Sequence, residues 1–293
     1  MEDQLEQQYM RSFDGTKIAY YLGGDPQGPP VVISAGLGGG LVAWRHVIEE
    51  LAPDHRLICW DYRGLFSSGP ARSPGDYAIE NHARDLKCLL EHLEIVDPVL
   101  LGWSMGVQVN FETCLSHWVK PRGIVAVHGT PGHPIDTAFN SSLPKKVAPY
   151  LFSVVRKAWR VAMKPAPVIV NSDRVVNLVM LGFRGLGWMD KGMSQRDFQD
   201  MARDWVELDL EAYTDIFDAL GRHDTTDRLH TLTAKTLVVA GSKDKFTPNY
   251  LSRTIEGLLP NSELVMVPSA THFGLMEHPD FVCQAIRKFV DGL

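Results

Sequence analysis

Short runs of consecutive apolar residues recur along the chain, and most are followed by a stretch in which apolar residues recur at helical spacing. We predict strands at residues 18–22, 31–33, 57–60, 99–101, 123–127, 236–240 and 263–267. We predict helices at residues 42–51, 78–93, 105–116, 250–258 and 280–290. Continuous apolar runs are typical of strands that are buried on both faces of a parallel sheet. The alternation therefore predicts an α/β fold with a doubly wound, mostly parallel sheet.

Residues 131–220 interrupt this alternation. The strand pattern fades there, and Trp, Phe, Met and Arg recur at helical spacing, as in residues 153–162 and 198–220. We interpret the segment as a helical cap inserted between two parts of one core, residues 1–130 and 221–293. Its large aromatic residues are candidates for a substrate pocket, although each could equally belong to the cap's own small core: Phe139, Trp159, Phe183, Trp188 and Trp205.

Charge and composition argue against several classes of function. The chain has 293 residues, with 29 Lys and Arg against 35 Asp and Glu, and it has no long basic run. We therefore expect no nucleic-acid partner, because phosphate backbones require a positively charged surface. The four cysteines form no C-x-x-C pair that would indicate zinc or redox chemistry, and they lie within apolar stretches at positions 59, 88, 114 and 283.

The N-terminal residues are acidic and polar, whereas a signal peptide begins with a basic end and continues with an apolar stretch. No segment approaches the roughly 20 apolar residues that span a bilayer. We therefore expect a cytoplasmic protein without a membrane span.

Gly102-Trp103-Ser104-Met105-Gly106 has the form G-x-S-x-G and lies between a predicted strand and a predicted helix. On such a tight turn a nucleophilic serine adopts a strained backbone, and the two glycines let strand and helix approach closely. The start of the helix also directs its dipole and free N–H groups toward developing negative charge. The motif in this context predicts that Ser104 is a nucleophile.

A serine hydroxyl needs an adjacent base that is itself oriented by a carboxylate. Asp244 directly follows the predicted strand 236–240, and His272 lies in a loop after the strand 263–267. This gives the chain order Ser, Asp, His that such a fold requires. We therefore assign Asp244 and His272 as the partners of Ser104.

Other residues compete for these roles. Asp136 is the main rival for the acid, because some hydrolases carry the acid after the preceding strand. His128 also follows a strand and could line the pocket, but a lone histidine at a strand end is more often structural. His278 precedes a proline near a predicted helix start, which favours a structural role.

The oxyanion formed during attack on a carbonyl requires two preorganised N–H donors. The N–H of Met105, directly after the nucleophile, is the first candidate. The second is the N–H of Leu37 in the glycine-rich loop 34–40. That loop lacks both G-x-G-x-x-G and the Lys-Ser/Thr ending of a P-loop, so its pattern does not favour nucleotide binding.

Taken together, the chain resembles the α/β-hydrolase superfamily, outside the cap. The resemblance rests on residues 34–37 with Trp44, 61–64, 102–106, 241–244, and 272–273 with 277–279. It implies the α/β-hydrolase fold with an inserted helical cap. Two departures stand out: Ala35-Gly36 replaces the usual His-Gly, and Leu65-Phe66 follows Asp-x-Arg-Gly where relatives usually have Gly-x-Ser.

We expect hydrolysis of a carboxylic ester or lactone of a small hydrophobic molecule, with no metal or organic cofactor. Trp103 and Phe273 join the cap aromatics as expected substrate-binding residues. A serine nucleophile argues against epoxide hydrolases and haloalkane dehalogenases, which use aspartate in this fold. The same triad would also serve a carbon–carbon bond hydrolase, a thioesterase or a cofactor-free perhydrolase or haloperoxidase. A small-molecule receptor with weak turnover is the alternative outside enzymes, and a monomer or a homodimer is compatible with either.

Overall fold

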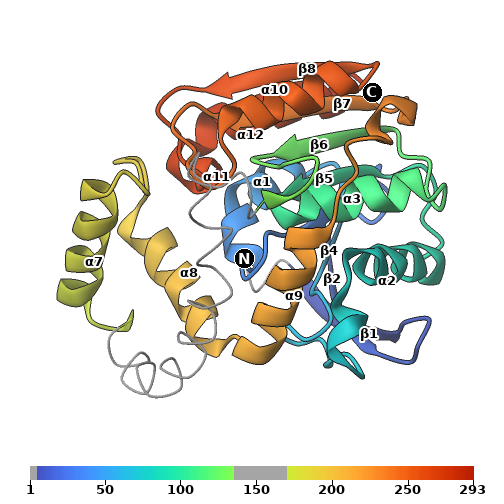
Figure 1. Ribbon diagram of the computed structural model, residues 1–293, viewed down its shortest axis with the longest axis horizontal. Helices are drawn as coiled ribbons and strands as arrows, with labels where there is room; N and C mark the ends of the chain where they lie inside the picture. The colour runs from blue at the N-terminus through green and yellow to red at the C-terminus, as the bar shows by residue number, and fades with distance from the viewer. Residues whose placement is uncertain (1–4, 135–169) are drawn as a thin grey trace.

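A computed structural model describes residues 5–134 and 170–293, and its centre is an eight-stranded sheet (Figure 1). The strand order is β1-β2-β4-β3-β5-β6-β7-β8. The strands are β1 (Leu5–Arg11), β2 (Lys17–Gly24), β3 (Pro30–Ser34), β4 (Arg56–Trp60), β5 (Val99–Trp103), β6 (Gly123–Val127), β7 (Lys235–Gly241) and β8 (Ser262–Val267). β1 and β2 pair antiparallel with each other and β2 with β4, whereas all later pairings are parallel. The predicted doubly wound, mostly parallel sheet is confirmed.

Strand β1 was not predicted, because its sequence Leu5-Glu6-Gln7-Gln8-Tyr9-Met10-Arg11 has too few apolar residues to form a run. It lies at the edge of the sheet and pairs with only one neighbour, β2, in register Leu5 to Gly23 through Arg11 to Lys17. An edge strand can expose one side and both faces to solvent, so polar residues are tolerated there.

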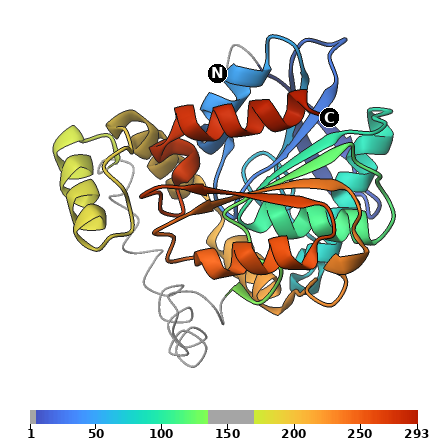
Figure 2. The ribbon, with the colours of Figure 1, turned by 90° about the horizontal axis from the view of Figure 1, so that it is seen from above.

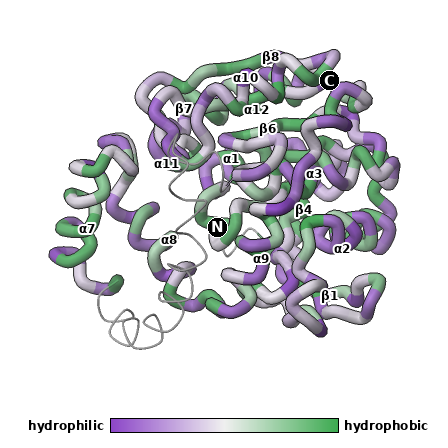
Figure 3. The backbone as a smooth tube through the Cα atoms, in the orientation of Figure 1, coloured by the Kyte–Doolittle hydropathy of each residue, from purple (hydrophilic) through white to green (hydrophobic). Residues whose placement is uncertain are grey.

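Alternate residues of the central strands supply two separate hydrophobic cores. Val31 and Ile33 of β3 belong to the first core, whereas Val32 between them belongs to the second. Successive strand side chains point to opposite faces, so one apolar run feeds both layers. The largely hydrophobic colour of β6 in Figure 3 reflects the same double burial.

Helices cover both faces of the sheet. The first core includes residues of α1 (Arg45–Leu51), α11 (Gly274–Glu277) and α12 (Pro279–Asp291), together with the short 3-10 helix η2 (Leu41–Trp44). The second includes residues of α2 (Ile79–His92), α3 (Met105–Leu115), α9 (Leu210–Arg222) and α10 (Asn249–Leu258), together with the 3-10 helices η3 (Pro74–Tyr77) and η5 (Leu229–Thr231). Figure 2 shows the sheet between these layers, with α12 and α10 on opposite sides.

The described part of the predicted cap, residues 170–220, is helical. It contains α7 (Asp173–Gly185), α8 (Gln195–Glu207) and α9. Figure 1 shows α7 and α8 beyond the edge toward which the parallel strands point. The predicted helix 153–162 lies outside the described residues.

The predicted helical stretch 198–220 is two helices. Asp209 separates them, and its side chain accepts hydrogen bonds from the backbone N–H groups of Glu211 and Ala212 at 2.8 and 3.0 Å. This carboxylate satisfies amides that the first turn of α9 leaves without helical partners. Periodicity does not detect such a break, because the apolar spacing continues across it.

The Asp-x-Arg-Gly segment holds a buried ion pair between a loop and α2. Arg63 donates from Nε and Nη2 to the two carboxylate oxygens of Asp85 at 2.7 and 2.6 Å, and both side chains are fully buried. Its Nη1 donates to Asp14 at 2.9 Å. The arginine thus ties the loop after β4 to α2 and to the turn between β1 and β2.

Candidate active site

Ser104 lies on the sharp turn between β5 and α3, and its backbone is strained there, with φ 54° and ψ −115°. A non-glycine residue in this region is uncommon and costs energy. The flanking glycines permit the turn. A Cβ at Gly102 would lie 2.6 Å from the backbone carbon of Gly106, and one at Gly106 would overlap the carbonyl oxygen of Ser34. The two predicted functions of these glycines, a tight turn and a close approach, are both visible in the geometry.

Three predicted residues meet at this turn although they are far apart in the sequence. Ser104 Oγ lies 3.0 Å from His272 Nε2, and His272 Nδ1 lies 2.9 Å from Asp244 Oδ2. Because Asp244 accepts the Nδ1 proton, the neutral imidazole leaves Nε2 free to accept the Ser104 hydroxyl proton. The geometry is that of a nucleophile, a base and an orienting acid.

The parallel sheet brings these residues together. β5, β7 and β8 run in the same direction, so the segments after them all emerge at one edge. Ser104 follows β5, Asp244 follows β7, and His272 follows β8. Ligand sites of open α/β sheets form at this carboxyl edge.

Asp244 is fully buried, yet its environment favours the charged form. Burial opposes ionisation, but the imidazole of His272 and the side chain of His128 outweigh that effect and hold the pKa of Asp244 well below its usual range. Its Oδ1 also accepts the backbone N–H groups of Phe246 and Thr247 at 2.8 and 2.9 Å. A carboxylate fixed by this many donors cannot rotate away from His272.

Thr247, which the sequence analysis did not identify, lies next to Asp244. Its hydroxyl lies 2.8 Å from Asp244 Oδ2, 2.8 Å from the carbonyl oxygen of His128 and 3.2 Å from His272 Nδ1. One hydroxyl proton serves one acceptor at a time. The sequence signal for this contact is the spacing: a threonine three residues after an aspartate can reach its carboxylate within one turn.

The rival residues lie in different places. His128 is fully buried next to the acid: its Nδ1 lies 3.1 Å from the backbone nitrogen of Gly241 and 3.3 Å from Asp244 Oδ2. His278 forms the N-cap position of α12, with Nε2 3.3 Å from Ser269 Oγ. Asp136 lies outside the described residues. Among the described carboxylates, Asp244 is the one bonded to the imidazole of His272.

The predicted oxyanion donors occupy the two segments next to Ser104. Met105 is the first residue of α3, so its N–H has no acceptor one turn earlier in the helix. Leu37 lies in the loop after β3, whose Ala35 carbonyl oxygen accepts the Tyr62 hydroxyl at 2.7 Å. Tyr62 belongs to the Asp-x-Arg-Gly segment. This contact therefore holds the loop in which alanine replaces the usual histidine.

Trp103, predicted to bind substrate, is 4% exposed. Its Nε1 donates a hydrogen bond to the backbone oxygen of His272 at 3.0 Å. Its six-membered ring lies against the glycine-rich loop 34–40: a Cβ at Gly36 would be 2.7 Å from Cε3, and one at Gly39 would overlap Cζ3. Only glycine at these two positions leaves room for the indole.

Aromatic side chains gather beside His272. The ring of Phe246 lies 5.4 Å from the imidazole between centroids, and Phe273 lies 6.4 Å from both Phe246 and Trp205. Two of these residues were predicted, whereas Phe246 was not. Phe183 instead contacts Trp188 and Phe198, a cluster within the cap helices and their connection. Phe139 and Trp159 lie outside the described residues.

Two aspartates near the edge of the sheet that carries Ser104 have raised pKa values. Burial raises the pKa of Asp61 to about 6, although Tyr21 and Ser67 donate hydrogen bonds to it. Burial, with the charges of Glu207 and other carboxylates, raises the pKa of Asp204 to about 7. Asp204 lies on α8 against Gly40 of the glycine-rich loop 34–40, where a Cβ would overlap its Oδ2.

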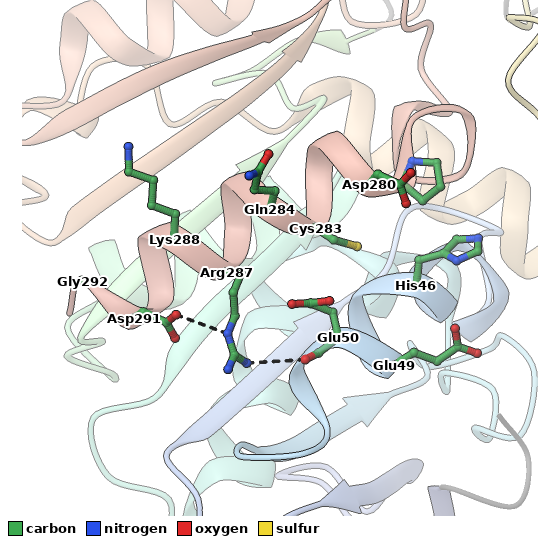
Figure 4. Close-up of a pocket in the computed structure, with 11 residues that line it drawn as sticks. His46, Glu49, Glu50, Asp280, Cys283, Gln284, Arg287, Lys288, Asp291 and Gly292 are labelled. Atoms are coloured by element: carbon green, nitrogen blue, oxygen red, sulfur yellow. Dashed lines mark hydrogen bonds and ion pairs between the residues drawn. The ribbon is translucent and has the colours of Figure 1, made fainter.

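A separate groove lies between α1 and α12 (Figure 4). Charged residues of both signs line it, including Glu49, Glu50, Arg287 and Lys288, and none of the predicted site residues does. The described residues contain no cluster of three or more His, Cys, Asp or Glu with metal-binding geometry. They also contain no helix with the length and apolar character needed to cross a bilayer.

Comparison with known proteins assigns the family. The model of the alpha/beta hydrolase fold family matches residues 29–138 and 160–279, which together form most of the chain. The protein therefore belongs to the alpha/beta hydrolase fold family, and the predicted resemblance is confirmed. It is a hydrolase of this fold.

Individual relatives are distant. A protein of Pseudomonas syringae pv. syringae, provisionally named carbamate hydrolase RutD, is 26% identical over 265 residues, covering 89% of this chain and 93% of its own. An esterase from Exiguobacterium antarcticum superposes with a TM-score of 0.80 at 20% identity, covering 98% of this chain and all of its own. The enol-lactonase from Burkholderia xenovorans LB400 gives 0.76 at 18% identity, covering 97% of this chain and all of its own. At these identities the structural matches establish the fold.

Proposed function

We propose that the protein hydrolyses a carboxylic ester or lactone of a small hydrophobic molecule through an acyl-Ser104 intermediate. The observation that carries the proposal is the continuous chain of contacts from Ser104 Oγ through His272 to Asp244, at 3.0 and 2.9 Å. Ser104 lies on a strained strand-to-helix turn, and backbone strain of this kind is typical of functional residues. The names of the structural neighbours, an esterase and an enol-lactonase, agree with this chemistry.

In the first half of the proposed reaction, Ser104 Oγ bonds to the substrate carbonyl carbon while its proton moves to His272 Nε2. The resulting oxyanion accepts hydrogen bonds from the N–H groups of Leu37 and Met105. As the bond to the alcohol oxygen breaks, His272 returns the proton to that oxygen. Asp244 stays ionised throughout and stabilises the imidazolium.

In the second half, His272 takes a proton from water, whose oxygen attacks the acyl carbon. Collapse of this second tetrahedral intermediate breaks the bond to Ser104, which recovers its proton from His272, and the carboxylic acid leaves. Each step uses groups of the chain, the substrate and water. In a lactone the alcohol stays attached to the acyl group.

The aromatic side chains beside His272 support the proposal that the substrate is apolar. Three aromatic rings form a connected group. Phe246 lies in the loop after Asp244, Phe273 directly follows His272, and Trp205 belongs to α8. Apolar walls with a few polar groups are typical of small-molecule sites. We propose that the helical cap, residues 131–220, covers the site and restricts the entry of water.

The nucleophile is tested by a fluorophosphonate probe and by p-nitrophenyl esters of short and medium acyl length. The wild type should be labelled and should turn over at least one ester. Ser104→Ala should lose labelling and about 10⁴-fold or more in kcat. Ser269→Ala, a serine of the same region without contact to the imidazole of His272, is the matched control. An unlabelled wild type, or labelling that survives in Ser104→Ala, would refute the proposal.

The acid is tested by two matched variants. Asp244→Asn should lower kcat by about 10⁴-fold. A neutral amide neither holds the imidazole in the required tautomer nor stabilises the imidazolium that forms during the reaction. Asp136→Asn should retain most of the activity. The opposite outcome would move the acid to the position after β6. A parallel panel of carbamates, lactones and thioesters then identifies which acyl bond is cleaved fastest.

A further inference from the structure

The side chain of Trp103 occupies a place where it contacts both segments that surround the nucleophile. It is the last residue of β5, directly before Ser104, and it is almost completely buried. One end of the indole donates to the His272 backbone oxygen at 3.0 Å. The other end fills the space above Gly36 and Gly39 of the glycine-rich loop 34–40, which we call the oxyanion loop because it carries the proposed donor Leu37.

We propose that Trp103 is a positioning residue that sets the distance between the base His272 and the oxyanion loop. The proposal rests on the function proposed above and adds a residue to it. The indole is a rigid plate, so two segments that contact its opposite ends are held at a fixed separation. Ser104, which must reach both the base and the oxyanion donors, lies one residue away.

Each segment also has contacts of its own, such as the Tyr62 hydroxyl on the Ala35 carbonyl oxygen and Asp244 on His272, but Trp103 contacts both segments with one rigid side chain. The oxyanion loop contains Gly36, Gly38, Gly39 and Gly40, and glycines are the residues with the greatest backbone freedom. The side chains that pack against the loop therefore restrict its conformation. On the other side, the indole N–H is buried and needs an acceptor, and the His272 carbonyl oxygen is that acceptor.

Catalysis is sensitive to such spacing. A misplacement of about 1 Å can cost roughly 10²-fold in rate even when it arises from a residue that does not touch the reacting atoms. A residue that only formed the pocket wall would act on substrate affinity instead. The two roles thus differ in which kinetic constant they change.

Trp103→Phe is the central variant, because it keeps an aromatic ring at the position but removes the N–H donor and the outer ring. With a p-nitrophenyl ester we expect kcat and the rate of fluorophosphonate labelling to fall 10- to 100-fold, with KM within threefold of the wild type. Trp118→Phe is the control: this indole lies beyond the C-terminal end of α3, is 36% exposed, and should change kcat less than threefold. Unchanged kcat in Trp103→Phe, or an increase in KM alone, would overturn the proposal.

A double-mutant cycle tests the second contact. Gly39→Ala places a methyl group against Cζ3 of Trp103 and should lower kcat by itself. In Trp103→Phe the outer ring is absent, so adding Gly39→Ala should cost clearly less than it does in the wild type. Equal costs in the two backgrounds would show that the indole does not set the loop.

A failure of the proposed hydrolase function can be distinguished from a failure of the positioning role of Trp103. A wild type without labelling or turnover removes the ester hydrolase, and the position of the base is then measured directly from the side-chain ¹⁵N resonances of His272. Trp103→Phe should shift these resonances, whereas Trp118→Phe should leave them in place. Unshifted His272 resonances in Trp103→Phe would refute the positioning role in either case.

Discussion

The buried pair Arg63–Asp85 allows a quantitative prediction for stability. Both side chains are fully buried, and the guanidinium contacts both carboxylate oxygens, at 2.7 and 2.6 Å. Asp85→Asn keeps the shape but removes the charge, which leaves a buried cation with Asp14 as its remaining carboxylate partner among the described residues. Breaking a buried ion pair by removing one partner typically costs about 3–5 kcal/mol. This is a large part of the roughly 5–15 kcal/mol that stabilises a typical domain.

The matched control is an exposed pair. Lys87 donates to Glu91 at 2.7 Å, and their side chains are 33% and 62% exposed. Glu91→Gln should cost about 0.5 kcal/mol or less, because water screens the charges and holding two long side chains costs entropy. Both variants are compared with the wild type by urea unfolding followed through tryptophan fluorescence.

A third variant separates the charge from the packing. Arg63→Met with Asp85→Leu removes both fully buried charges together and should recover at least half of the stability lost in Asp85→Asn, because the charge that loses its partner is then Asp14, which is 16% exposed. The reasoning is refuted if Asp85→Asn costs no more than Glu91→Gln. It is refuted as well if the double variant is less stable than Asp85→Asn.

Three further predictions concern the edges of the site. Because the folded-state pKa of Asp61 is raised to about 6, its contribution to stability is present below about pH 4 and is lost as the pH rises through 6, so Asp61→Asn should raise the urea midpoint more at pH 8 than at pH 4. Gly106→Ala should greatly lower the thermal midpoint through overlap with Ser34, whereas Gly182→Ala, in open space on α7, should stabilise by up to about 1 kcal/mol. Glu277 accepts the N–H groups of Thr271 and Asp190 at 2.8 and 2.7 Å, so Glu277→Gln should speed tryptic cleavage near Lys191, and exposed Glu263→Gln should not. Equal midpoint shifts in the first two comparisons, or equal cleavage rates in the third, would contradict them.

Several features were determined by the sequence alone because they depend on local patterns. Continuous apolar runs such as residues 123–127 mark strands that are buried on both faces, and the observed β6 has these bounds. The elbow around Ser104 was identified by its glycines and flanks, since a strained turn needs small residues at fixed positions. Ser104, Asp244 and His272 each follow a strand of the parallel sheet, which placed all three at one edge of the sheet.

Only the tertiary structure decided which distant groups touch. It bonded Asp244 to His272 and added Thr247 to them, and it placed the indole N–H of Trp103 against the His272 carbonyl oxygen. Strand β1 likewise depends on its partner β2, because its own residues carry no strand pattern. A sequence pattern records the periodicity of one element and the face that it buries. The acceptor of a buried N–H, the partner of a buried charge and the spacing of two loops depend on contacts across more than a hundred residues, so they exist only after the elements have packed.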